Sequence, residues 1–78
     1  PTAEAARPPA DRAELAFWRG WLSKLAGDAA AAEDHWHTAW LLDPAREDVR
    51  AGLIIIWSAA GACPDWGLEL LEAVIAEE

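Results

Sequence analysis

The side chains that could do chemistry in this 78-residue sequence are two histidines, one cysteine and 14 carboxylates. His35 and His37 are two residues apart in a predicted helix, so their side chains point about 200° apart and cannot share a metal ion. His37 follows Glu33 by one helical turn, which gives an edge of two ligands without a third. The sequence therefore predicts no metal site and favours a solvated histidine beside an acid.

The single cysteine does not have the neighbours that a nucleophile needs. Cys63 precedes Pro64 in a predicted turn, and neither histidine is spaced to act as its base. The carboxylates are scattered along polar faces, and no glycine-rich phosphate loop is present. Six tryptophans could cage an ammonium ligand, but most of them lie on packing stripes. We expect no catalytic residue and no cofactor.

Composition and charge limit the remaining classes of function. A chain of this length supplies one small core, and one cysteine excludes an internal disulfide framework. The formal net charge of −8 repels nucleic acid and anionic lipid. No apolar run approaches the roughly 20 residues that span a membrane. We therefore expect neither a nucleic-acid partner nor direct insertion into a membrane.

Local signals predict four helices. Asp11 with Glu14 forms a variant of the capping box that opens the first helix, and Gly27 ends it. Asp28 caps a second helix. The first helix carries an amphipathic stripe at three- and four-residue steps, made of Leu15, Trp18, Leu22 and Leu25.

The second half of the sequence repeats this logic. Asp43 and Pro44 predict a helix from about Ala45 to Ala60, which Gly61 ends. Its apolar run 53–57 is also compatible with a strand, but the signals at both ends favour a helix. Pro64 and Asp65 open a fourth helix, whose main apolar stripe is Leu68, Leu71 and Ile75, with Leu70 and Val74 beside it.

Residues 1–10 differ from the rest because they are rich in alanine and proline and lack large apolar side chains. They are predicted to form a flexible tether, followed by a helical domain over residues 11–78. The sequence starts at Pro1 rather than at a methionine, so we expect it to come from a longer protein.

An internal repeat relates the two halves of the domain. A shift of 34 residues aligns the helix-ending Gly27 with Gly61, and it aligns apolar positions such as Leu22 with Ile56. Further apolar pairs are Leu15 with Val49, Trp36 with Leu70, Trp40 with Val74 and Leu41 with Ile75.

A helix–turn–helix period of 34 residues resembles the tetratricopeptide family. The best match is residues 16–44, where Gly20 takes the small position at the helix contact and Trp36 the aromatic position. The other matching positions are Gly27-Asp28 at the turn, Ala32, Ala39 and the closing Leu42-Asp43-Pro44. Departures are Ala16 and Ser23 in the first unit, and Ile54 and Trp66 at small positions of the second.

The resemblance implies an all-α fold of two stacked antiparallel helical hairpins, with repeat units at about 13–46 and 47–78. It also implies a ligand groove along the first helix of each unit, lined by Glu14, Phe17, Trp21, Lys24, Asp48, Ala51, Ile55 and Ser58. A clamp for a peptide carboxylate is disfavoured, because Trp21 and Ile55 replace its asparagine and Lys24 is the only cation. An apolar groove for an amphipathic helix or an extended apolar segment fits better.

These observations predict a non-catalytic module for protein–protein interaction. Its partner would be a protein segment or a second copy of the chain, in which case it forms a homodimer. The predicted partner-binding residues are Phe17, Trp21, Lys24, Ile55 and Trp57. The acidic C-terminal half could steer a basic partner, but the sequence favours a solvated helix face as its explanation.

An alternative remains open for the same residues. Phe17 and Trp21 could pack against a flanking part of a longer chain, which makes this domain a structural end-piece of a larger enzyme or membrane-associated assembly. Two units are fewer than the three or so that such stacks need for a continuous core. In either case we expect apolar surface that something outside this sequence buries.

Overall fold

The computed structural model describes residues 9–76, and this part of the chain contains four α-helices and no strand. The helices are α1 (Pro9–Leu25), α2 (Ala29–Leu42), α3 (Glu47–Ala60) and α4 (Asp65–Ala76). The all-α prediction is confirmed, and the apolar run 53–57 is helical. The predicted tether lies outside the described residues except at Pro9 and Ala10, where the prediction is wrong because α1 begins there.

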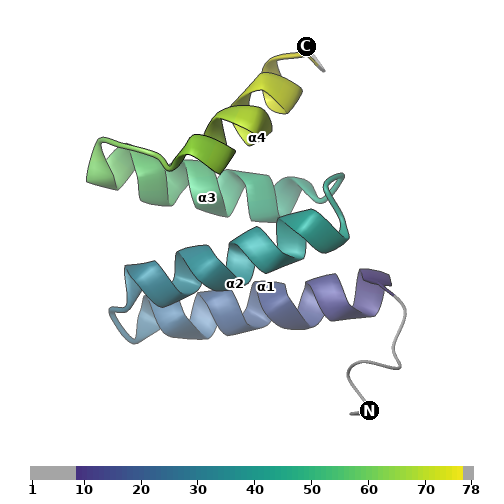
Figure 1. The fold of residues 1–78 in the computed structure, drawn as a ribbon. Coiled ribbons are helices and arrows are strands. Elements are labelled where there is room, and N and C mark those ends of the chain that lie inside the picture. The colour runs from purple at the N-terminus through teal and green to yellow at the C-terminus, as the bar shows by residue number, and fades with distance from the viewer. Residues whose placement is uncertain (1–8, 77–78) are drawn as a thin grey trace.

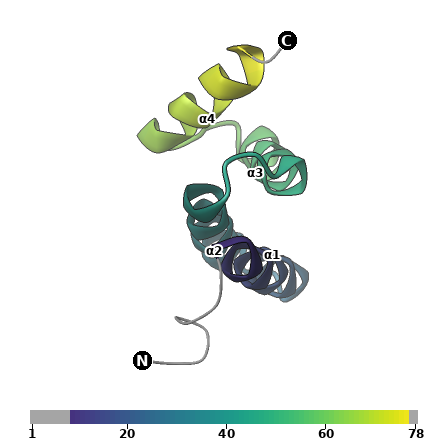
Figure 2. The ribbon, with the colours of Figure 1, turned by 90° about the vertical axis from the view of Figure 1, so that its right-hand side faces the viewer.

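Successive helices run in opposite directions and build a stack (Figure 1). Seen from the side, α1 and α3 lie in one layer, whereas α2 and α4 lie in the other (Figure 2). The hairpin of α1 and α2 is closely packed along its length, but α4 diverges from α3 toward its C-terminal end (Figure 1). The fold is therefore two stacked hairpins, of which the second is open.

The turn between α1 and α2 follows directly from its sequence. Gly27 adopts a left-handed conformation with φ of 86°, which costs a glycine little. The N–H of Asp28 donates to the carbonyl of Ser23 at 2.9 Å, and the N–H of Gly27 donates to that of Lys24 at 3.0 Å. This is a Schellman turn. The Asp28 carboxylate then accepts from the N–H of Ala31 at 3.0 Å, which confirms the predicted cap of α2.

Two predicted helix starts are wrong. α1 begins at Pro9 rather than after Asp11, since proline has the φ of a first turn and needs no amide donor there. α3 begins at Glu47 rather than at Ala45. Asp43 closes α2 instead, and the N–H of Arg46 donates to the Asp43 carbonyl at 3.2 Å, which places Pro44 in the intervening turn.

The core is organised around Trp36 of α2, which has no exposed surface. A Cβ added at Gly20 of α1 would lie 2.2 Å from Trp36 Nε1, and one added at Gly52 of α3 would lie 2.8 Å from its Cζ3. The indole ring is thus in contact with α1 through one glycine and with α3 through the other. Its Nε1–H donates to the carbonyl of Phe17 at 2.9 Å, so the buried donor is satisfied.

The predicted apolar stripes do not form the core. In α1, Trp18, Leu22 and Leu25 are 55%, 67% and 78% exposed, and the helix packs through the opposite face. That face consists of small residues and one aromatic, namely Ala13, Ala16, Phe17 and Gly20. In α4, Leu68 and Ile75 are exposed while Leu70 is fully buried. Both terminal helices therefore turn their strongest apolar stripe away from the chain's own core.

No helix within residues 9–76 combines the length and the apolar character needed to cross a bilayer. The longest, α1, has 17 residues.

Candidate functional site

An apolar hollow of about 230 Å³ lies between α1 and α3, and we call it the α1–α3 groove. Trp36 of α2 contributes to its lining from the layer beneath. Only two of the lining side chains are charged, Lys24 and Asp48. The complete lining is Phe17, Trp21, Lys24, Trp36, Asp48, Ala51, Gly52 and Ile55.

Three aromatic rings line this groove, two from α1 and one from α2. Phe17 stacks on Trp36 with ring centroids 6.2 Å apart, and Trp21 meets Trp36 edge-on at 5.7 Å. Phe17 is 8% exposed, whereas Trp21 is 37% exposed. Trp21 is therefore held in place by buried rings while it still presents surface to a partner, which is the arrangement of an aromatic anchor.

The groove continues past Lys24 and Ile55 into a second hollow of about 330 Å³. Lys24 and Ile55 line both hollows, and Ile55 is 57% exposed. The second hollow is otherwise lined by Ala29, Ile56, Ala59 and Ala60. The joint surface thus follows the length of α3 and provides room for several side chains of a bound segment.

An ion pair lies at the N-terminal end of α3 beside the groove. The Arg46 guanidinium donates to the Asp48 carboxylate from NH2 at 2.7 Å and from Nε at 3.1 Å. These hydrogen bonds lower the pKa of Asp48 and raise that of Arg46. Arg46 also lies over the Phe17 ring, with 5.2 Å from Cζ to the centroid. Because Asp48 pairs with Arg46, Lys24 is the charged side chain of the lining to which a partner could bring an opposite charge.

The structure brings four of the five predicted partner-binding residues together in this groove. Phe17, Trp21 and Lys24 reach it from α1, and Ile55 reaches it from α3. Asp48 and Ala51 of the wider predicted lining are also there, whereas Glu14 and Ser58 are not.

Trp57 does not lie in the α1–α3 groove. It comes two residues after Ile55 and therefore points to another side of α3. It is 5% exposed, and its Nε1–H donates to the Glu33 carboxylate of α2 at 3.3 Å. The prediction did not include Gly52 in the lining, although a glycine in the middle of a helix was a signal of close approach.

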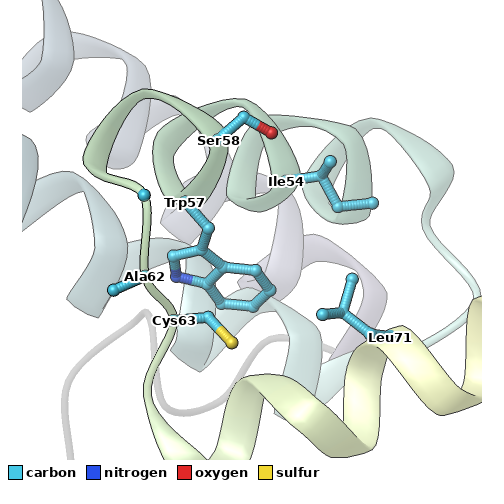
Figure 3. Close-up of a pocket in the computed structure, with 7 residues that line it drawn as sticks. Ile54, Trp57, Ser58, Ala62, Cys63 and Leu71 are labelled. Carbon is cyan, nitrogen blue, oxygen red and sulfur yellow. The ribbon is translucent and has the colours of Figure 1, made fainter.

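A further hollow of about 350 Å³, the α3–α4 pocket, lies where α4 diverges from α3. Figure 3 shows the Trp57 ring at its centre, with Ile54 of α3 and Leu71 of α4 to one side. Cys63 is half-buried in its wall. The lining contains no His, Asp or Glu, so it offers the thiol no general base.

His37 belongs to an aromatic cluster between α2 and α4. His37 stacks on Trp66 with centroids 3.6 Å apart and an interplanar angle of 5°, and Trp40 lies 6.1 Å from the same ring. His37 is thus a packing residue rather than a solvated one. Within residues 9–76, no group of three or more His, Cys, Asp or Glu side chains is placed to hold a metal ion.

No protein-family model, curated protein or solved structure matches the chain.

Proposed function

We propose that this chain is a non-catalytic, tetratricopeptide-like interaction module whose α1–α3 groove binds an apolar or amphipathic segment of a partner protein. The observation that carries the proposal is the half-exposed Trp21, seated on the buried Trp36 and facing the exposed Ile55 across an apolar hollow. Aromatic anchors in preformed apolar pockets supply much of the affinity of protein interfaces.

The shape of the groove favours a segment over a small molecule. Its two hollows join along α3 instead of closing around one ligand, and their lining offers few polar groups to orient one. An amphipathic helix or an extended strand can place successive apolar side chains over Trp21 and Ile55.

The charges of the groove restrict the partner further. Lys24 lies where the two hollows meet, so an acidic side chain on the segment would pair with it. The net charge of −8 elsewhere on the chain favours basic residues in the flanks of the segment, which would speed association. The partner segment is therefore apolar at its centre and basic at its ends.

The proposal is tested by a matched pair of substitutions on α1. Random peptides displayed on phage are selected against the wild-type chain, and recovered peptides are titrated by fluorescence against Trp21→Ala and Trp18→Ala. Both residues are exposed tryptophans three positions apart, but only Trp21 lines the groove. We expect Trp21→Ala to weaken binding by about 30-fold or more, which corresponds to a hot spot of about 2 kcal/mol. Trp18→Ala should leave affinity unchanged.

The same pair separates binding from a structural role. Because Trp21 is partly exposed, its truncation should lower the free energy of unfolding by only about 1 kcal/mol. If no peptide is enriched, or if Trp18→Ala abolishes binding as strongly as Trp21→Ala, the groove is not the binding site. A large loss of stability in Trp21→Ala would favour the structural end-piece instead.

A further inference from the structure

α1 and α4 lie at opposite ends of the stack (Figure 1), and each carries an apolar stripe that is largely exposed. The α1 stripe is Leu15, Trp18, Leu22 and Leu25, and the α4 stripe is Leu68, Leu71 and Ile75. Leu25 is 78% exposed and Ile75 is 69% exposed. Solvent-exposed apolar rows of this length mark interaction surfaces in soluble proteins.

The internal repeat indicates what the α1 stripe packs against. At the 34-residue shift, Leu15 corresponds to Val49 and Leu22 to Ile56. Val49 and Ile56 are 0% and 8% exposed, because α3 packs there on α2, the second helix of the preceding unit. The equivalent neighbour for α1 is therefore a helix in the place of α4, the second helix of a unit.

The charges of the two helices are complementary. α1 carries two cations outside the α1–α3 groove, Arg12 and Arg19, and a third, Lys24, inside it. α4 carries three acids, Asp65, Glu69 and Glu72, and no cation within Asp65–Ala76. A contact between two α4 helices would bring acids together, whereas a contact between α1 and α4 pairs opposite charges.

Arg19 shows this complementarity at one position. At the repeat shift it corresponds to Leu53, which is fully buried between α2 and α3. A second copy would therefore place the Arg19 guanidinium against α4, whose charged side chains are all acidic. At that contact an arginine would lie beside acidic side chains, so the exchange of leucine for arginine fits a neighbouring α4.

The α3–α4 pocket supplies the matching cavity. It opens between the diverging helices, and Leu71 of the α4 stripe forms part of its wall (Figure 3). Ile54 and the Trp57 ring complete an apolar seat of about 350 Å³. A helix placed there would lie over α3 and beside α4, as α3 itself lies over α1 and beside α2 (Figure 2).

We propose that copies of this chain associate head to tail, with the α1 stripe of one copy seated on the α4 stripe and α3–α4 pocket of the next. The contact joins two different surfaces, so it propagates into a chain of copies instead of stopping at a symmetric dimer. The proposal does not rest on the α1–α3 groove, because none of the four residues of the α1 stripe lines it.

The test uses one exposed leucine on each surface. Leu22→Glu disables the α1 stripe and Leu68→Glu disables the α4 stripe, and both positions are more than half exposed, which preserves the fold. Molar mass is measured by light scattering from micromolar to millimolar concentration, with helicity checked by circular dichroism. We expect the wild type to grow beyond a dimer, each variant alone to stay monomeric, and their equal mixture to stop near twice the chain mass of 8.5 kDa.

Every other pattern overturns the proposal. A wild-type chain that stays monomeric at millimolar concentration excludes self-association and leaves the stripes to another protein. If Leu68→Glu associates like the wild type, the contact joins two α1 helices; if Leu22→Glu does, it joins two α4 helices. An equal mixture that stays monomeric excludes complementary faces.

A charge reversal gives an independent check of orientation. Arg19→Glu should weaken association by about two- to fivefold, the range for one ion pair near the surface. Lys24→Glu changes the net charge equally but lies in the α1–α3 groove, and it should have no such effect. Equal weakening by both variants would mean that net charge, rather than the α1–α4 contact, controls association.

Discussion

Both hairpins place a glycine against a tryptophan ring, but the first is closely packed along its length and the second is open. In the first, Gly20 allows α1 to approach the Trp36 ring, and Gly52 of the next unit covers the other part of that ring. In the second, Gly67 allows α4 to approach Trp57, with a Cβ position 2.9 Å from Cη2. Both rings border a hollow, Trp36 the α1–α3 groove and Trp57 the α3–α4 pocket, but only the second hairpin is open.

The difference shows what a buried indole needs in order to fix helix geometry. Trp36 has zero exposure, and its N–H donates to a backbone carbonyl at 2.9 Å. Trp57 donates to a flexible carboxylate at 3.3 Å, and its ring has free volume beside it. A glycine opposite an aromatic ring brings two helices close, but the pair is held only when a third element covers the ring.

The largest loss of stability is expected when Trp36 is truncated. Trp36→Ala should lower the free energy of unfolding by about 3–5 kcal/mol, because it removes a fully buried ring that contacts three helices. Trp66→Ala in the second hairpin should cost less, since Trp66 is half-buried. Urea unfolding followed by circular dichroism measures both. A Trp66→Ala variant as unstable as Trp36→Ala would mean that the two hairpins are equally packed.

Alanine substitutions at Gly20 and Gly67 test how much room each tryptophan ring has to move. Gly20→Ala should destabilise by about 1–3 kcal/mol, because its Cβ would overlap the fully buried Trp36 ring, which Gly52 of α3 contacts from another side. At Gly67 the Trp57 ring can shift into the α3–α4 pocket, so the helix propensity gain of alanine, about 0.5–1 kcal/mol, offsets the strain. Thermal melting compares the two variants. Equal losses would contradict the idea that the pocket relieves strain.

The smallest expected effect concerns the ion pair beside the α1–α3 groove. The Arg46 hydrogen bonds hold the pKa of Asp48 below its ordinary value of 3.8. The pair therefore stabilises the folded chain above that value, and the contribution disappears as the pH falls through the lowered pKa. Asp48→Asn should cost less than about 1 kcal/mol at neutral pH, because the carboxylate is 43% exposed.

Urea titrations of the wild type and Asp48→Asn at several pH values measure this contribution. The stability difference between them should shrink toward zero in acid. A difference that persists below the pKa of the carboxylate would show that the substitution acts through packing.

Much of the fold follows from local sequence. Gly27, Asp28 and Gly61 act through the backbone within a few residues, so their turn and cap geometry is readable from the chain alone. The family resemblance placed Gly20 at a close contact between helices, but it did not predict that Trp36 is the ring which Gly20 meets. The start of α3 was not predicted correctly, because Asp43 can cap the end of one helix as well as the beginning of another.

The direction of each apolar face could not be predicted. Leu22 and Leu25 form a regular stripe, and amphipathicity does not say whether the chain's own core or another surface covers it. For the candidate site, the family resemblance implied Phe17 and Trp21 for one wall and Ile55 for the other, and all three line the α1–α3 groove. Trp57 was assigned to the wrong side, because tryptophan content alone carries no information on orientation.

Gly20 and Gly52 have a consequence for how the two walls of the groove are spaced. Because neither glycine has a side chain, the Trp36 ring alone separates the backbones of α1 and α3 at these two positions. The width of the groove that a bound segment meets is therefore determined by the side chain at position 36. A smaller aromatic there would narrow the groove without altering any atom that a partner touches on α1 or α3.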